Sequence, residues 1–280
     1  MDGVLLVEKE KDITSSDVVV KLRKILNTKK IGHTGTLDPI ATGLLVVTIG
    51  KATKISELLT TKYKEYIATM KLGVKTDTYD VTGNVLDTCK VPTDLDFEAI
   101  LKEYQTTYMQ EVPIYSSVKV KGKKLYEYAR NGEKVELPKK EVEIKEIELL
   151  NVEGEYVTFR CVVSKGTYIR SLINDIGNDI CCFACMSDLV RTKVDKFSLE
   201  DAYTLDDVIN NKHELISISD ALDYPKITVD GDIYNKIIHG MKIDNTYNVK
   251  DKCIFIDTND NILGIYEVDN MKLKVWKNFV

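Results

Sequence analysis

The sequence predicts an α+β fold, in which a mixed, largely antiparallel sheet is flanked by helices and followed by a small β-rich unit. The sheet is predicted because strand-like and helix-like segments alternate irregularly along the chain. Several strand pairs are also joined too closely for the helical crossovers that parallel sheets require. The second unit is predicted because, beyond about Lys226, short strand-like segments surround one helix-like segment that ends at Gly240. We therefore expect two domains, at residues 1–224 and 225–280.

The first segments predict a helix, a strand and a second helix. "TSSDVVVKLRKIL" offers Thr14 or Ser15 as an N-cap and has an apolar stripe along one face, which is typical of an amphipathic helix. "GLLVVTIG" is predicted to be a buried strand from its length and its β-branched residues. "KATKISELL" is then predicted to begin a helix.

Three further segments have the pattern of strands. In "YKEYIATMKLG" polar and apolar residues alternate, which places Tyr66 and every second residue after it on one face. "VEIKEIELL" and "YVTFRCVV" are predicted strands as well, while "TDTYDVTGNV" is polar and rich in turn-forming residues.

The segment "SKGTYIRSLINDIG" predicts the end of a strand followed by a helix. If the strand continues to Arg170, then Tyr168 and Arg170 lie on the same face, and Ser171 caps a helix whose apolar stripe begins at Leu172. A helix that began earlier would separate the two polar side chains by about 200°. The apolar stripe favours the later start and hence a site shared by the tyrosine and the arginine. The alternative is an ordinary pair of surface residues.

The segment "KKIGHTGTLDPIATG" is the clearest candidate for a functional site. It places Asp38 before Pro39, in a run with three glycines and no other acid. Proline fixes its own φ and restricts the residue before it, while glycine lets the backbone approach a ligand closely. The pattern therefore predicts a stiff loop that displays a single carboxylate, with His33 nearby.

Opposed clusters of charge indicate an anionic partner, although the formal net charge is −5. Between Val18 and Lys54 seven basic residues accompany one acid, Asp38, and the segment 119–134 is a second basic cluster with two tyrosines. Residues 195–223, by contrast, hold eight acids and two lysines. Patches of this kind can bind an anion on one face of an acidic protein. Either basic cluster alone could equally be a solvated helix face.

Several other chemistries lack their motifs. The pair Gly50-Lys51 has no glycine at the spacing that a Walker loop requires. Cys181, Cys182 and Cys185 are close in sequence, but only three histidines occur and none has zinc-ligand spacing, so we expect buried thiols there. No G-x-S-x-G motif occurs, and a glycosidase needs two facing carboxylates where this loop supplies one.

The composition predicts a soluble, cytoplasmic protein. The chain has 280 residues, of which 44% are apolar and 30% charged. "MDGVLLVEKEKD" lacks the pattern of a signal peptide, and no apolar run reaches transmembrane length. Six cysteines without an export signal indicate a reducing compartment. We therefore expect no association with a membrane.

Four segments, in order, resemble the tRNA pseudouridine-55 synthases of the TruB family: "GHTGTLDPIATG", "KEYIATMKLGVKTDTYDVTG", "YSSVKVKGKKLYEYARNG" and "SKGTYIRSLINDIG". The resemblance spans nearly the whole chain. It implies that the protein isomerises the uridine at position 55 in the T-arm of tRNAs to pseudouridine. In that reaction the N1–C1′ bond breaks, the base rotates, and C5 bonds to C1′. No atom is gained or lost, so neither a cofactor nor a metal is expected.

The resemblance also implies roles for single residues. Asp38 matches the catalytic aspartate, and the sequence leaves open whether it attacks C1′, stabilises a cation-like sugar or helps to remove a 2′ proton. Tyr66 matches the tyrosine that stacks on the target base and is a candidate for the final proton removal. Arg170 matches the arginine that pairs with the catalytic carboxylate. The residues implied in substrate binding are His33, which fills the gap left by the flipped uridine, Tyr168 and Leu189 in the pocket, and Lys9, Lys121, Lys123 and Lys124.

The partner implied by the resemblance is tRNA. An insertion near residues 114–142 is expected to clamp the T-arm, and residues 225–280 resemble the small PUA barrel that contacts the acceptor arm. We expect no obligate protein partner and hence a monomer. The sequence departs from the family pattern in two places. Glu10 and Asp12 replace a proline and a glycine, and Val190-Arg191 replaces an arginine pair, which is expected to remove one phosphate contact.

Two other functions compete with this one. The first is a guide-dependent pseudouridine synthase, which usually has a longer tail and basic extensions that this sequence lacks. The second is an RNA-binding or tRNA-folding protein in which catalysis is secondary. The presence of Asp38, Tyr66 and Arg170 favours a working enzyme. The sequence does not indicate which tRNAs are preferred.

Overall fold

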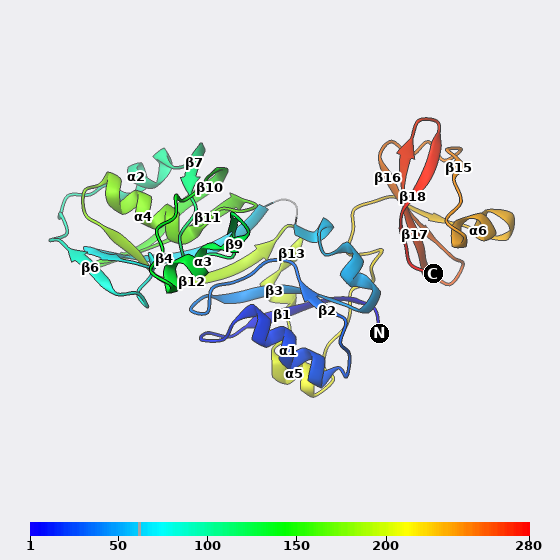
Figure 1. Cartoon of the computed structure of the whole chain (residues 1–280), viewed down its shortest axis with the longest axis horizontal. Helices are drawn as coiled ribbons and strands as arrows, with labels where there is room; N and C mark the ends of the chain where they lie inside the picture. Colours follow the sequence, from blue (N-terminus) through cyan, green and yellow to red (C-terminus); the bar gives the residue numbers. More distant parts are fainter. Residues whose placement is uncertain (61–62) are drawn as a thin grey trace.

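The computed structural model describes residues 1–60 and 63–280, and the strands in these ranges form one large sheet, one smaller sheet and two separate two-stranded hairpins (Figure 1). In the described chain the large sheet has nine strands, in the order β1-β3-β12-β4-β11-β10-β7, with β2 beside β3 and β13 beside β12. The pair β12–β3 is parallel and the other described pairs of this sheet are antiparallel. The predicted mixed, largely antiparallel sheet is therefore confirmed. Its strands are β1 (Gly3–Lys9), β2 (Ile31–His33), β3 (Thr42–Ile49), β4 (Tyr63–Leu72), β7 (Thr107–Glu111), β10 (Lys139–Glu153), β11 (Tyr156–Ser164), β12 (Ala184–Val194) and β13 (Phe197–Ser198).

The first helix, α1 (Ser15–Ile25), has the predicted cap and the predicted buried face. The Thr14 hydroxyl accepts a hydrogen bond from the backbone N–H of Asp17 at 3.0 Å, and the Asp17 carboxylate accepts one from the Thr14 N–H at 2.9 Å, which completes a capping box. Val18 and Leu22 are fully buried in a cluster with residues of β1 and β3. The helix therefore packs against the face of the sheet formed by β1 and β3, and the Asp38 loop leads into β3.

The segment after β3 does not begin an α-helix as predicted. It forms two 3₁₀ turns, η1 (Gly50–Ile55) and η2 (Leu58–Thr60). The Thr53 and Ser56 hydroxyls donate to the carbonyls of Gly50 and Thr53, at 2.8 and 3.0 Å. Such local side-chain bonds compete with the helical ladder and favour tight turns.

The large unit has a second long helix and several short elements. Helix α4 (Ile169–Asp179) packs against β12 and buries Leu172, Ile173 and Ile176 in the main core. The other elements are the hairpin β5 (Val74–Thr76) and β6 (Val85–Thr88), helix α2 (Phe97–Glu103), the turn η3 (Leu199–Asp201) and helix α5 (Leu205–Ile209).

Helix α4 begins three residues earlier than predicted, at Ile169 instead of Leu172. Tyr168 is its N-cap, with extended backbone angles (φ −104°, ψ 113°), and Arg170 lies in the first turn. The hydroxyl of Ser171 does not cap the helix but donates to the carbonyl of Glu111 at 2.8 Å. The separation of about 200° between the Tyr168 and Arg170 side chains does not arise. The rotation of 100° per residue applies only within the helix, and Tyr168 precedes the helix.

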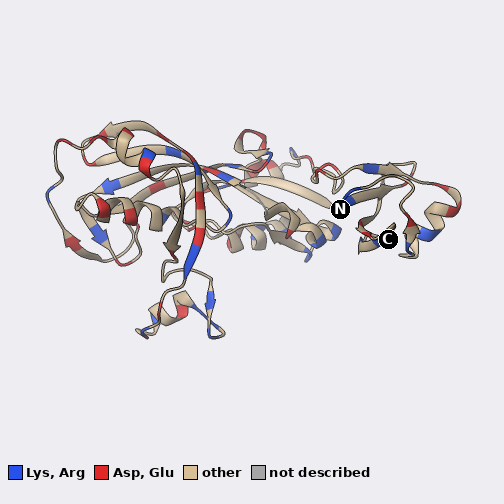
Figure 2. Cartoon of the chain, turned by 90° about the horizontal axis from the view of Figure 1, so that it is seen from above, with Lys and Arg blue, Asp and Glu red and all other residues tan. Residues whose placement is uncertain are grey.

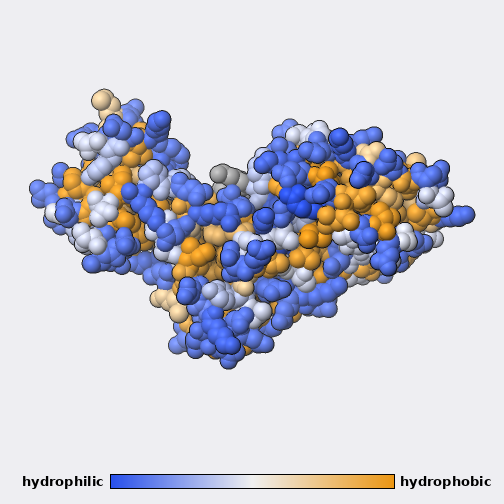
Figure 3. All heavy atoms as spheres, turned by 180° about the vertical axis from the view of Figure 1, so that it is seen from behind, coloured by the Kyte–Doolittle hydropathy of each residue, from blue (hydrophilic) through white to orange (hydrophobic). Residues whose placement is uncertain are grey.

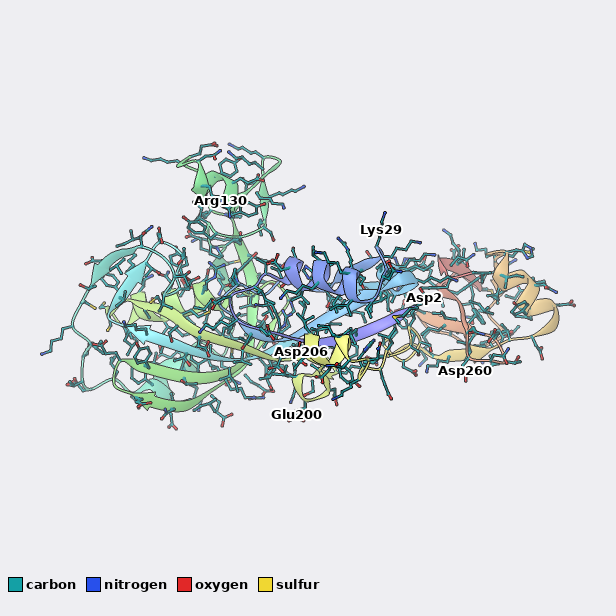
Figure 4. All side chains as sticks on the ribbon, turned by 90° about the horizontal axis from the view of Figure 1, so that it is seen from below. Asp2, Lys29, Arg130, Glu200, Asp206 and Asp260 are labelled. Atoms are coloured by element: carbon teal, nitrogen blue, oxygen red, sulfur yellow. The ribbon has the colours of Figure 1, made fainter. Side chains whose placement is uncertain are left out.

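An arm projects from the large unit between β7 and β10 (Figure 2). The chain leaves the sheet after Glu111 and returns at Lys139, which is its partner in the sheet register. The resemblance placed this insertion near residues 114–142. In the structure residues 139–142 belong to β10 and not to the insertion. Figure 4 shows Arg130 on the arm, away from the body of the molecule. The arm consists of β8 (Lys119–Val120), β9 (Lys123–Lys124) and α3 (Leu125–Arg130).

The C-terminal sheet has five strands in the order β14-β16-β17-β18-β15 and, seen from behind, forms a lobe separated from the rest by a notch (Figure 3). The five strands curve into a half-barrel, which agrees with the predicted PUA-like architecture. The predicted helix ends at Ile238, and Gly240 follows with a φ of +66°, a conformation typical of the residue after a helix. The elements are β14 (Lys226–Thr228), α6 (Gly231–Ile238), β15 (Ile243–Asp244), β16 (Lys252–Ile256), β17 (Ile262–Asp269) and β18 (Lys272–Asn278).

The two units share an apolar cluster, in which Ile254 and Phe279 pack with Val4 and Ile55. Polar contacts surround it: Lys54 donates to the Asn278 carbonyl at 2.6 Å, and Lys277 and Glu57 form an ion pair at 2.6 Å. Lys51 likewise donates to the carbonyl of Phe279. Two lysines of the first basic cluster, although exposed, therefore contribute hydrogen bonds to the contact between units.

Within the described ranges no helix is long and apolar enough to span a membrane. Of the three clustered cysteines, Cys182 and Cys185 are buried as expected, whereas Cys181 is exposed.

Candidate active site

The Asp38 loop, strand β4 and the start of α4 surround a cavity of about 680 Å³, which the base of the arm also borders. The sequence placed ten residues in the catalytic and substrate-binding set. Six of them line this cavity, namely His33, Asp38, Tyr66, Tyr168, Arg170 and Leu189. The other four, Lys9, Lys121, Lys123 and Lys124, do not.

The Asp38 loop is held in place by the end of β1 and by helix α1. The Ser15 hydroxyl accepts the backbone N–H of Leu37 at 2.9 Å. The carbonyl of Pro39 accepts the N–H of Asp12 at 2.8 Å and the ammonium of Lys9 at 3.2 Å. Because these contacts bracket Asp38 on both sides, the carboxylate is displayed by a loop with a fixed backbone, as the sequence predicts.

Arg170 donates hydrogen bonds to both oxygens of the Asp38 carboxylate. Its Nε donates to Oδ2 at 2.9 Å and its Nη2 to Oδ1 at 3.1 Å. The Arg170 side chain is 5% exposed, whereas the Asp38 side chain is 33% exposed. Arg170 also donates to the carbonyls of Thr78 and Tyr115, at 2.9 Å each. The buried fork therefore orients the carboxylate toward the cavity and ties the loop to α4, the β5–β6 turn and the arm.

Tyr66, Leu189 and Tyr168 give the cavity aromatic and apolar walls. In the pairing of β4 with β12, Leu189 lies opposite Ala68, and Tyr66 lies opposite Arg191. Burial raises the pKa of the Tyr66 hydroxyl, and the nearby Arg191 charge opposes this only in part. Burial also raises the pKa of Tyr168. Both hydroxyls therefore stay protonated at neutral pH, and the rings offer surfaces on which a flat base can pack.

His33 lies at the end of β2 and is half-buried. Burial lowers the pKa of its imidazole, and the positive charge of Arg191 lowers it further. A neutral ring is consistent with its Nδ1, which accepts the N–H of Gly35 at 3.3 Å. At neutral pH His33 therefore contributes shape and hydrogen bonding to the rim of the cavity, without a charge.

The resemblance implied that Lys9 binds the substrate, but Lys9 is fully buried and does not line the cavity. Its ammonium donates to the carbonyls of Glu10, Ile13 and Pro39, at 2.8, 2.7 and 3.2 Å. Burial lowers its pKa to about 8. The structure thus places Lys9 behind the Asp38 loop as a support for its backbone.

Two of the three arm lysines lie over tyrosine rings. Lys123 lies over the Tyr128 ring at 4.6 Å and pairs with Glu133 at 2.6 Å. Lys124 lies over the Tyr126 ring at 5.4 Å, and Tyr126 itself borders the cavity. Lys121 is exposed at the turn of the hairpin. The arm therefore presents cations and aromatic faces together, on a module whose base borders the site.

Three residues near the site were not identified from the sequence as members of it. Asp80 is buried beside Arg170, with 3.9 Å between its Oδ2 and the guanidinium Nε. Arg191 is buried and donates to the carbonyls of Leu44 and Gly35, at 2.7 and 3.1 Å. Lys64 lines the cavity. The alternation of β4 could have identified Lys64, because it shares a face with Tyr66.

Models of known families match most of the chain. A model described as "TruB family pseudouridylate synthase (N terminal domain)" matches residues 23–169. A model described as "tRNA pseudouridylate synthase B C-terminal domain" matches residues 170–223.

Curated relatives match over nearly their full lengths. A tRNA pseudouridine synthase B of Bacillus cereus is 43% identical, with 95% of this chain and 92% of the relative covered. Those of Caldanaerobacter subterraneus and Clostridium kluyveri are 40% and 39% identical, with 98% and 100% of both chains covered.

Among solved structures, the chain is similar to one in an H/ACA RNP bound to a substrate RNA containing 2′-deoxyuridine, at 25% identity and a TM-score of 0.74. It is also similar to a chain of a Cbf5-Nop10-Gar1 complex, at 27% identity and a TM-score of 0.73. Each likeness covers 99% of this chain and 85% of the other. Fold and comparisons together define the class as the pseudouridine synthases. Within that class, the chain belongs to the TruB family of tRNA pseudouridine synthases.

Proposed function

We propose that this chain converts the uridine at position 55 in the T-arm of tRNAs to pseudouridine, with Asp38 as the catalytic group. The observation that carries the proposal is the bidentate Asp38–Arg170 pair at the wall of a cavity lined by Tyr66 and Tyr168. A single oriented carboxylate beside aromatic surfaces suits a reaction in which a planar base is detached, turned and reattached.

The chemistry needs one carboxylate and no second acid. When the N1–C1′ bond breaks, uracil leaves as a resonance-stabilised anion, so the leaving group does not have to be protonated first. The C5–C1′ bond then forms, C5 loses its proton, and N1 gains one, which leaves the atom count unchanged. Because Arg170 is buried behind the more exposed Asp38 side chain, the carboxylate is the group that C1′ and the 2′ position would meet. Attack, charge stabilisation and proton removal all remain compatible with this placement.

The target nucleotide must leave its stack to reach Asp38, because C1′ and C5 are not both accessible in a stacked strand. In the proposed complex the uracil ring packs between Tyr66, Tyr168 and Leu189. The uncharged His33 at the rim fills the gap that the nucleotide leaves in the RNA. Tyr66 is protonated in the free protein, so a role in final proton removal requires its own proton to be displaced.

The two projecting parts of the chain are the proposed RNA contacts outside the pocket. The arm, with Lys121, Lys123 and Lys124, would clamp the T-arm, and residues 225–280 would contact the acceptor arm. The chain would act in the cytoplasm as a monomer. Residues 1–224 would form its catalytic domain and residues 225–280 its second RNA-binding domain. The solved relatives in H/ACA complexes suggest a second candidate, modification directed by a guide RNA and protein partners.

The deciding experiment is incubation of the purified protein with an unmodified tRNA transcript, without other RNA or protein, followed by mapping of pseudouridine. Pseudouridine at position 55 supports the proposal, and a transcript with cytidine at that position should remain unmodified. Activity that depends on an added guide RNA would favour the second candidate. Improved tRNA folding without pseudouridine would favour a role in RNA folding.

A further inference from the structure

Four cationic side chains gather at one side of the cavity. Lys64, Lys140 and Lys165 line the cavity, and Arg191 lies behind Lys64 on the neighbouring strand β12. None of the four forms an ion pair within residues 1–60 and 63–280. The lining residues include one carboxylate, Asp38, and Arg170 occupies both of its oxygens.

The second observation is an orphaned donor on Arg191. The side chain is 1% exposed, and its Nε and Nη2 donate to the backbone carbonyls described above. Its Nη1 is buried and makes no well-aligned hydrogen bond in the described chain, although the Tyr66 hydroxyl lies close to the guanidinium. A Cβ placed on Gly35 would lie 3.6 Å from this Nη1 and 2.9 Å from the Lys64 Nζ. The two cationic groups are therefore neighbours beside a residue that has no side chain.

An arrangement of this kind is costly in the free protein. Buried charges are normally paired, and a buried donor without an acceptor gives up its hydrogen bond to water without replacement. The effect is visible on Lys64, whose pKa falls to about 8 through burial and through the charges of Arg191, Lys165 and Lys140. A bound anion in the cavity would accept hydrogen bonds from the lysine ammonium groups and offset the repulsion among the four positive charges.

We propose that Lys64, with Lys140 and Lys165 around it and the buried charge of Arg191 behind it, binds a backbone phosphate of the RNA strand that carries the target uridine. This assignment rests on the proposed function, which places that uridine against Tyr66. Lys64 precedes Tyr66 by two residues on the same face of β4, a distance of about 7 Å along the strand. The anion is therefore a phosphodiester next to the flipped nucleotide, held on the same wall as its base.

The test combines a neutral linkage in the RNA with a neutral side chain in the protein. A T-arm stem-loop is prepared in which one or the other phosphate flanking the target uridine is a methylphosphonate, which carries no charge. Wild-type protein should bind one of the two substituted stem-loops about tenfold more weakly than the all-phosphate RNA, as expected when a charge-assisted hydrogen bond is removed. Lys64→Gln should bind the all-phosphate RNA with the same loss of affinity and be insensitive to the neutral linkage.

The matched control is Lys71→Gln, which removes a lysine from the same strand at a position outside the cavity, where it lies over the Tyr156 ring. This control should bind like wild type and keep the sensitivity to the methylphosphonate. Wild-type affinity of Lys64→Gln, or an equal linkage effect in Lys64→Gln and wild type, would overturn the proposal.

Thermal unfolding of the free protein separates binding from a structural role. Lys64→Gln should melt at the same temperature as wild type or higher, because an unpaired cation kept for a ligand does not stabilise the free chain. A lower melting temperature would contradict the proposal. If wild type modifies position 55 but ignores both linkages, only this inference fails. If it shows the linkage effect but forms no pseudouridine, the proposed function fails.

Discussion

Gly43 lies directly opposite Arg191 where β3 and β12 pair in parallel, and its missing side chain is what lets the strands meet. A Cβ at residue 43 would lie 2.4 Å from the Arg191 carbonyl oxygen and 2.8 Å from its amide nitrogen. Gly43 also has a φ of +99°, which side-chain-bearing residues rarely adopt. This contact joins the strand that follows the Asp38 loop to the strand that carries Leu189.

Gly43→Ala should therefore destabilise the protein by about 2 kcal/mol or more, through backbone strain together with the steric clash. Urea unfolding measures the change. Gly132→Ala is the matched control, because Gly132 also has a positive φ, +65°, but nothing lies within 4 Å of an added Cβ. It should cost about 1 kcal/mol. Similar destabilisation of the two variants would show that the close approach of β3 to β12 matters little.

Asp38→Asn should abolish pseudouridine formation and leave tRNA affinity within about a few-fold of wild type. The neutral amide removes the charge that the reaction needs, whereas a negative charge among phosphates does not favour RNA binding. Pseudouridine mapping at position 55 and filter binding of the same tRNA are the two measurements. Turnover close to the wild-type rate would exclude the assigned role.

Replacing the arm residues Lys121, Lys123 and Lys124 together with alanine should weaken tRNA binding and flatten its salt dependence. Each interaction with a phosphate that is removed lowers the slope of log K against log salt by roughly 0.7 to 0.9. Turnover at saturating tRNA should fall much less, because these lysines do not line the cavity. The control changes three exposed lysines of the C-terminal unit that form no ion pair in the described structure, Lys236, Lys250 and Lys274. Equal slopes for the two triple variants would rule out the arm as the clamp.

The stability difference between Lys64→Gln and wild type should depend on pH. The pKa of Lys64 is about 8 in the folded protein, below its ordinary value of 10.5. Between these values the unfolded chain binds more protons than the folded one, so the contribution of Lys64 to stability rises with pH. Lys64→Gln should thus be more stable than wild type by up to about 3 kcal/mol below pH 8, and this advantage should vanish toward pH 10.5. Urea unfolding of both proteins at several pH values measures it, and a difference that does not vary with pH would contradict the expectation.

Local pattern in the sequence was sufficient for the parts of the fold whose stability is local. The Thr14 cap, the apolar stripe of α1 and the alternation along β4 depend on residues a few positions apart. The loop that displays Asp38 was predictable because glycine and proline restrict or free the backbone by their own covalent structure. Four motifs in order were also enough to indicate the family, and with it the six residues that line the cavity.

Only the tertiary structure decided how distant residues meet. Local patterns favoured a helix after β3 and a later start for α4, and both predictions were wrong. After β3, the Thr53 hydroxyl bonds to the nearby Gly50 carbonyl and favours a tight turn. At α4, the Ser171 hydroxyl does not cap the helix because it bonds to the carbonyl of Glu111, which is distant in sequence.

Lys9 and Arg191 are basic residues of the kind that usually contact RNA at a protein surface, yet both are buried. Arg191 faces Tyr66 through the register of β4 and β12, strands that are far apart in the chain. Which charges are removed from water, and which lack a partner, depends on that pairing, since burial and pairing are properties of neighbours in space and not in sequence.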